Sequence, residues 1–172
     1  MKTCNAFAKL TICVLSALII AIFVNVHKVD AESITDCQNL VIGTYLTSSS
    51  GDFGSFSSIT TFTRDGNFFA NASNQSGDPS LSVQPYSEVQ GSWKCTSNRE
   101  ITGTVLSFSY PTATLPGTIN KCDIRATFDP KNGIEQGTIT IKSFGLNANP
   151  FSDDAPVRGT FTLTGQRVKP GQ

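Results

Sequence analysis

Residues 119–133 read INKCDIRATFDPKNG, and residues 121–128 alternate in polarity. The apolar side chains fall at even positions: Cys122, Ile124, Ala126 and Phe128. The polar side chains fall between them: Lys121, Asp123, Arg125 and Thr127. A period of two is typical of a β-strand with one dry face and one wet face. The Asn132-Gly133 pair that follows favours a tight turn, so the stretch predicts a strand and the start of a hairpin.

Similar runs, rich in Thr, Ser, Val, Ile and Phe, recur after residue 40. Eight of them read as strands, at residues 40–47, 56–63, 67–73, 86–95, 101–110, 119–128, 134–144 and 157–168. No helix is predicted in residues 32–172. Eight strands joined in sequence favour an all-β fold, an eight-stranded antiparallel up-and-down barrel, because a closed barrel leaves no exposed sheet edge. A two-sheet β-sandwich is the alternative.

The connections between these runs alternate between long and short. Four are long, at residues 48–55, 74–85, 111–118 and 145–156. Three are short, at residues 64–67, 96–100 and 129–133. Successive turns of an up-and-down barrel lie at opposite ends, so the long connections are expected to gather at one end. The sequence therefore predicts a mouth at which something binds.

The start of the chain predicts export. Lys2 and Lys9 precede the apolar run LTICVLSALIIAIFVNV, and Val29-Asp30-Ala31 follows it. This order is typical of a secretory signal peptide cut after Ala31, and the run is shorter than the ~20 residues of a spanning helix. We expect a signal peptide at 1–31 and one β-barrel domain at 32–172, secreted or periplasmic, without stable membrane anchoring after cleavage. An uncleaved N-terminal anchor is the alternative.

Residues 32–172 contain no histidine, because His27 is the only one in the chain. Ser-His-Asp catalysis, Cys-His catalysis and zinc sites with histidine ligands are therefore excluded from this segment. The segment holds 10 Lys and Arg against 12 Asp and Glu without a basic cluster, which argues against nucleic acid as a partner. No cofactor and no catalytic residue is predicted.

Three cysteines, Cys37, Cys95 and Cys122, lie in the same segment, which allows one disulfide. In the predicted barrel Cys37 and Cys95 both fall at the short-turn end. One strand separates Cys95 from Cys122, so at one level they lie about 9–10 Å apart, beyond disulfide reach. The topology favours a Cys37–Cys95 disulfide with Cys122 as a buried free thiol. A Cys37–Cys122 pairing is the alternative.

Gly43-Thr44-Tyr45 resembles the Gly-x-Trp that opens lipocalin-type barrels, with Tyr in place of Trp. Arg167, at the end of the last predicted strand, matches the Arg that packs across that aromatic ring. The chain is thus similar to a small calycin-like barrel over residues 40–168, although the Thr-Asp-Tyr signature of lipocalins is absent. The resemblance implies a one-chain container for a small apolar ligand, with both residues at the closed end.

Four large side chains are the candidate ligand-binding residues: Trp93, Leu106, Phe108 and Tyr110. We predict that they point inward near the mouth and line a ligand cavity; the alternative is that they fill the barrel. Four aspartates fall in the long connections: Asp52, Asp78, Asp153 and Asp154. Carboxylates suit Ca²⁺, but their spacing matches no calcium loop, so we interpret them as solvated turns and predict no metal site.

Three functions remain open for the predicted barrel. The first is binding of a small hydrophobic molecule at the four long connections, which requires a hollow interior. The second is an interaction or inhibitor module with a solid core, whose protein partner binds at an apolar patch involving Phe53 or Phe151. The third is an isomerase-type or cyclase-type enzyme, which needs an inward carboxylate, Tyr or Lys with a shifted pKa. The sequence favours the first and favours a binding protein over an enzyme.

Overall fold

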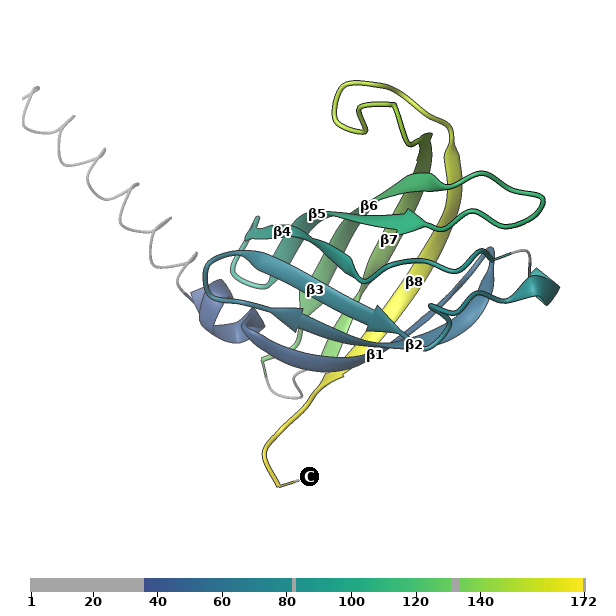
Figure 1. Cartoon of the computed structure of the whole chain (residues 1–172). Helices are drawn as coiled ribbons and strands as arrows, with labels where there is room; N and C mark the ends of the chain where they lie inside the picture. The colour runs from purple at the N-terminus through teal and green to yellow at the C-terminus, as the bar shows by residue number, and fades with distance from the viewer. Residues whose placement is uncertain (1–35, 82, 131–133, 172) are drawn as a thin grey trace, which may run out of the picture.

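Eight strands close into one barrel in sequence order (Figure 1). The computed structural model describes residues 36–171 except 82 and 131–133, so the predicted signal peptide lies outside the described residues. Every neighbouring pair of strands is antiparallel, including β1 and β8. The predicted up-and-down barrel is confirmed, and the sandwich is not found. The strands are β1 (Gly43–Gly51), β2 (Gly54–Phe62), β3 (Asn67–Ala72), β4 (Val89–Cys95), β5 (Glu100–Ser109), β6 (Thr118–Phe128), β7 (Ile134–Gly145) and β8 (Val157–Arg167).

The beginning of the barrel differs from the prediction. Residues 36–41 are helical, whereas the sequence predicts no helix and a strand from residue 40. The N–H of Ile42 donates to the carbonyl of Gln38 over 3.0 Å, as in an α-helical turn. Cys37 and Val41 lie four residues apart on one helical face, and both are fully buried. A short 3₁₀ helix, η1 (Pro79–Leu81), is a second departure and lies between β3 and β4.

The long and short connections lie at opposite ends of the barrel, with one correction. Residues 48–55 are not a long loop, because β1 and β2 stay paired as far as Gly51 and Gly54 and only two residues join them. Three long connections remain, at residues 73–88, 110–117 and 146–156. They define the open end, together with the tip of the β1–β2 hairpin (Figure 1). The connections 63–66 and 96–99, with the end of β6 and the start of β7, define the closed end.

The closed end is filled by aromatic side chains. The Phe62 ring lies 5.7 Å from that of Trp93 and 5.1 Å from that of Phe68, measured between ring centroids. Tyr45 and Phe128 complete the cluster, with centroids 5.5 Å apart. All these pairs meet edge to face, a geometry that adds about 0.5–1.5 kcal/mol per pair beyond area burial. This half of the barrel has a solid core.

The helical turn closes the barrel from outside this core. A disulfide joins Cys37 to Cys95 of β4, with Cα atoms 6.2 Å apart, so the favoured pairing is confirmed. Cys122 is buried and forms no disulfide, also as predicted. The Arg167 guanidinium lies 5.3 Å from the Tyr45 ring centroid and donates to the Tyr45 hydroxyl and to the carbonyl of Leu40. The contact implied by the resemblance is therefore present.

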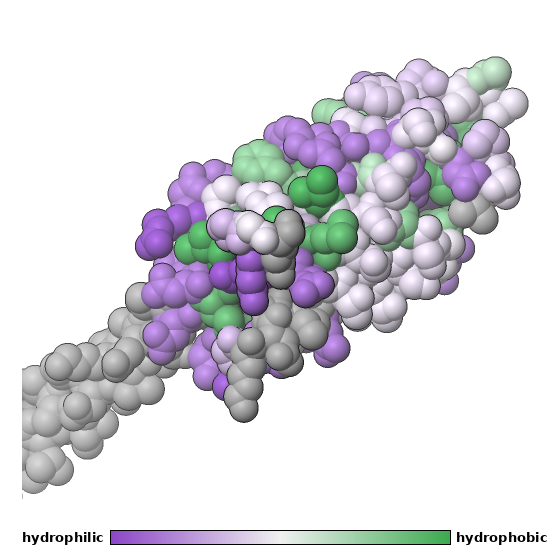
Figure 2. Space-filling view, turned by 90° about the horizontal axis from the view of Figure 1, so that it is seen from below, coloured by the Kyte–Doolittle hydropathy of each residue, from purple (hydrophilic) through white to green (hydrophobic). Residues whose placement is uncertain are grey.

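The outer surface is largely polar. Seen from below, hydrophilic and pale residues cover most of the barrel, and hydrophobic residues are scattered among them (Figure 2). Leu46 and Ile59 are exceptions that pair directly across β1 and β2, each 57% exposed. Because the polar face of the strands meets water and the apolar face turns inward, the interior of the barrel is the part suited to an apolar molecule.

Candidate functional site

The interior is hollow at the open end. A cavity of about 170 Å³ lies above the aromatic core. Most of its surface is apolar, from side chains that include Phe53, Phe56, Val105, Ile139, Phe161 and Leu163. Strands from all sides of the barrel contribute, as does the connection 73–88, through Val83.

The cavity exists because inward side chains become smaller towards the open end. In β1 the inward face runs from Tyr45 through Thr47 to Ser49. In β2 it runs from Phe62 through Thr60 to Ser58, and in β5 from Val105 through Ser107 to Ser109. An eight-stranded barrel is just wide enough for large side chains to fill, so these short hydroxyl side chains leave space.

The hydroxyls on the β1–β2 wall bind one another. Thr47 Oγ1 lies 2.7 Å from Ser58 Oγ and 3.1 Å from Thr60 Oγ1. It also donates to the Ser58 carbonyl over 3.2 Å. A buried polar group that is already hydrogen-bonded does not need a polar ligand. This wall is therefore compatible with an apolar molecule.

A second polar chain crosses the opposite wall near the mouth. Asn120 of β6 donates to Ser109 Oγ of β5 over 2.7 Å. Ser143 of β7 donates to the Asn120 side-chain oxygen, also over 2.7 Å. Arg158 of β8 donates to Ser143 Oγ over 3.4 Å. Side chains thus link four neighbouring strands by hydrogen bonds. The last member of this hydrogen-bonded row, Arg158, is a cation.

A β-bulge turns Arg158 towards the cavity. Ile141 pairs with Gly159 and Lys142 pairs with Val157, so Arg158 is the extra residue in β8. The regular alternation predicts Val157 inside and Arg158 outside. Val157 is instead 54% exposed, and Arg158, which is also exposed, lines the rim of the cavity. The inward placement of Val157 is wrong because a bulge shifts the parity of every residue beyond it.

Phe53 forms the rim beside Arg158. The Arg158 Cζ atom lies 5.7 Å from the centroid of the Phe53 ring, within the range of a cation–π contact. The Phe53 ring also packs 6.0 Å from that of Phe161. Gly159 leaves room for it, since a Cβ there would lie 2.6 Å from the ring. Phe53, predicted as an exposed patch residue, is part of the cavity.

Two titratable side chains of the cavity, Cys122 and Tyr86, are neutral near pH 7. Burial, and then the charge of neighbouring Asp123, raise the pKa of the Cys122 thiol to about 12. Burial, with a smaller contribution from Cys122, raises the pKa of Tyr86 to about 12. The Tyr86 hydroxyl also donates to the Asn74 side-chain oxygen. Arg158 is the only charged side chain lining the cavity among the described residues.

The four candidate ligand-binding residues lie elsewhere. Trp93 points inward, but it is buried in the aromatic core and does not line the cavity. Leu106, Phe108 and Tyr110 lie on the outward side of β5 and just beyond it; Phe108 is 52% and Tyr110 51% exposed. The predicted inward placement of these three is wrong.

The disulfide indicates which face of β5 points into the barrel. Cys95 pairs directly with Ile101, and directly paired residues share a face. Since Cys95 must face inward to meet Cys37, the odd positions of β5 face inward and the even ones outward. The aromatic content of Phe108 and Tyr110 pointed to the opposite assignment, because both faces of this strand are partly apolar.

Gln84 fixes the long connection 73–88 at the mouth, and the sequence did not single it out. Its side-chain nitrogen donates to the carbonyls of Tyr110 and Pro116, over 3.0 and 3.1 Å. The N–H of Tyr110 donates in return to the carbonyl of Pro85 over 2.8 Å. Gln84 is buried and lines the cavity. The connection is therefore fixed by hydrogen bonds and forms one wall of the cavity.

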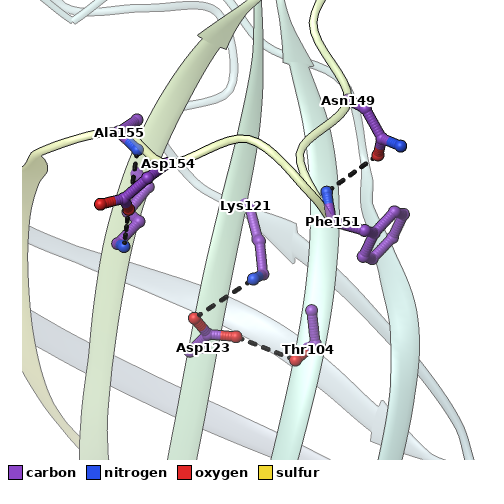
Figure 3. Close-up of polar contacts among 8 residues, drawn as sticks. Thr104, Lys121, Asp123, Asn149, Phe151, Asp154 and Ala155 are labelled. Carbon is purple, nitrogen blue, oxygen red and sulfur yellow. Dashed lines mark hydrogen bonds and ion pairs between the residues drawn. The ribbon is translucent and has the colours of Figure 1, made fainter.

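The aspartates of the open end have separate partners. Asp154 pairs with Lys142 over 2.8 Å, which lowers the pKa of that carboxyl (Figure 3). Asp52 accepts from the N–H of Thr160, and Asp153 from the N–H of Asn149, both over 2.8 Å. The described residues contain no group of three or more potential metal ligands.

The outer face of β5 and β6 carries the polar ladder that the alternation predicts. Asp123 accepts a hydrogen bond from Thr104 over 2.9 Å and lies 3.8 Å from the Lys121 ammonium (Figure 3). Ladders of this kind favour a solvated surface over aggregation.

Within the described ranges, no helix has the length and apolar character needed to cross a membrane.

Comparison with family models, with curated proteins and with solved structures found no match to this chain. The closed eight-stranded antiparallel barrel and the Tyr45–Arg167 contact are compatible with a calycin-like fold.

Proposed function

We propose that this protein binds a small apolar molecule in the cavity at the open end. The observation that carries the proposal is the cavity of about 170 Å³ above a solid aromatic core. An engineered protein cavity of about 150 Å³ lined by apolar side chains holds benzene. A ring or a short alkyl chain thus fits the cavity. Any further part of the ligand would lie in the mouth.

The polar groups of the site support a binding role over an enzymatic one. Tyr86 is an inward phenol of the kind an isomerase would need, but its raised pKa makes it a poor proton acceptor near neutral pH. No carboxylate or Lys lines the cavity among the described residues, so no proton acceptor of that kind faces a bound molecule. The Cys37–Cys95 disulfide supports export to an oxidising compartment.

Titration of octanol into the purified protein, followed by calorimetry, tests the proposal. We expect saturable binding of one molecule. Ser107→Phe places a ring in the cavity and should weaken binding at least about tenfold, since no room is left for the ligand. Thr102→Phe is the matched control, because Thr102 lies on the same strand but faces outward. Equal binding by both variants, or no saturation in the wild type, contradicts the proposal.

Protein binding at the rim of the open end is a second candidate. Six large hydrophobic side chains in or beside the long connections are exposed: Phe108, Tyr110, Leu115, Leu146, Phe151 and Val157. Phe151 is 69% exposed and projects from the connection 146–156 (Figure 3). This reading needs no cavity, so the hollow interior favours the first candidate. Phe151→Ser should leave octanol binding unchanged and abolish binding of a protein partner.

A further inference from the structure

We infer that the bound molecule is amphipathic and carries one anionic group, of which a carboxylate is the simplest, held by Arg158 at the rim of the cavity. This inference rests on the proposed function. It adds the chemical class of the ligand and the residue that selects it.

The charge of Arg158 has no counter-ion within the described part of the chain. No carboxylate there lies within 4.0 Å of its guanidinium, and no other charged side chain among those residues lines the cavity. The acidic groups of the open end are engaged elsewhere, Asp52 by the Thr160 N–H and Asp154 by Lys142. A single unpaired cation at the edge of an apolar space attracts an anion.

The local backbone and side chains hold Arg158 at that edge. The bulge turns it to the side of the cavity, and bulges beside binding sites commonly re-aim one side chain. The Phe53 ring at 5.7 Å and Ser143 Oγ at 3.4 Å orient the guanidinium. Five N–H groups belong to a guanidinium, and the contact to Ser143 uses one of them. The rest are available to a ligand.

The remaining interior suits the apolar part of such a molecule. Cys122 and Tyr86 stay protonated near neutral pH because each has a pKa of about 12, so no negative charge inside repels an anion. The hydroxyls of Thr47, Ser58 and Thr60 bind one another. An anion at the rim keeps its hydration in part, whereas an anion deep inside would lose it. A guanidinium binds a carboxylate through two parallel hydrogen bonds, which fixes its orientation.

Octanoate and octanol have the same chain length and differ in charge, so comparing them by calorimetry tests the inference. The wild type is expected to bind octanoate about tenfold more tightly than octanol. Arg158→Gln should remove this preference, so that octanoate binds no more tightly than octanol. Arg125→Gln, on the outer face, is the matched control and should keep the preference. Added salt should weaken octanoate binding only, because an exposed ion pair is screened.

The outcomes separate the two proposals. Equal affinity for octanoate and octanol in the wild type, or a preference that survives in Arg158→Gln or is insensitive to salt, overturns the inference and leaves the proposed function standing. Absence of binding of both molecules to the wild type overturns the proposed function and the inference with it.

Discussion

At the scale of single residues, Arg167 does the most to hold the closed end together. Its guanidinium joins β8 to the Tyr45 hydroxyl and to the carbonyl of Leu40 at the helical turn. These are charge-assisted hydrogen bonds at a half-buried site, a setting where loss of the donor leaves acceptors without partners. The contact therefore ties the last strand to the first strand and to the helical turn that precedes it.

Arg167→Met should lower the free energy of unfolding by about 2 kcal/mol, since the charge-assisted hydrogen bonds are lost while most of the side-chain volume is kept. Urea denaturation measures the change. Arg125→Met is the control, because Arg125 is exposed and its ion pair with Glu100 should contribute less than about 1 kcal/mol. Equal effects of the two substitutions would contradict the role assigned to Arg167.

Cys122 makes stability depend on alkaline pH. Burial favours the thiol over the thiolate, so its pKa rises from an ordinary 9.0 to about 12 in the folded protein. The unfolded chain releases this proton first, and the stability is therefore lost as pH rises from 9 to 12. The urea midpoint should fall over this range, and less steeply in Cys122→Ala. A wild-type midpoint that stays constant there would disprove the burial of the thiol.

Residue patterns predict only part of the site, and β5 shows why. The sequence places Phe108 and Tyr110 inside because large apolar residues are more often buried. The inner face of this strand instead ends in Ser107 and Ser109, and these short side chains create the cavity. A hollow site reverses the usual rule, since its lining must be small. Hydrophobicity alone cannot reveal this.

At the scale of elements, the β2–β3 hairpin is the clearest case of local control. Gly66 has a φ of +83°, a conformation that costs other residues free energy. A Cβ on Gly66 would also lie 3.2 Å from the carbonyl oxygen of Trp93. The Asp65-Gly66 pair marks this turn in the sequence, and the hairpin forms there as predicted.

Gly66→Ala should destabilise the protein by about 1 kcal/mol or more, because alanine is strained at positive φ. Gly145→Ala is the matched control. Gly145 ends β7 with φ outside the left-handed region, and a Cβ added to it would meet no atom within 4 Å, so its effect should lie near zero. Thermal unfolding measures the stability of both variants. If Gly145→Ala destabilises the protein as much as Gly66→Ala does, the role assigned to the turn is contradicted.

Strand boundaries follow from the sequence except where the side chains carry weak signals. Ser48, Ser49 and Ser50 read as a loop, yet they pair with both β2 and β8. Serine side chains give only a weak signal for a strand, but pairing with a neighbour on each side supplies the backbone hydrogen bonds that hold this strand. The bulge at Arg158 is likewise invisible to alternation, because it depends on how β7 and β8 meet at the rim.

At the scale of the whole molecule, one covalent bond connects the helical turn to the barrel. The Cys37–Cys95 disulfide spans 58 residues of sequence and restricts the unfolded chain. Reduction should lower the free energy of unfolding by about 2–4 kcal/mol while the barrel stays folded. Urea unfolding with and without reductant measures this loss. A Cys37→Ala variant should lose the same stability, and reductant should not change its stability further. That result would identify the Cys37–Cys95 disulfide as the bond responsible.

The topology, the two distinct ends and the disulfide could all be predicted from spacing, because connection lengths and parity constrain a closed meander strongly. The cavity could not, since its volume depends on the summed side chains of several strands. The Tyr45–Arg167 contact was implied by resemblance and is present, whereas the ligand-binding function remains a proposal supported by the hollow open end.

Methyl NMR during a titration with octanol tests the central claim most directly, because it reports where a ligand sits. The methyl groups of Val105, Ile139 and Leu163 line the cavity, whereas those of Leu46 and Ile59 are exposed on the outer face. We predict saturable shifts of the first three, with the last two unchanged. Shifts confined to Leu46 and Ile59, or changes that never saturate, would contradict a binding site inside the barrel.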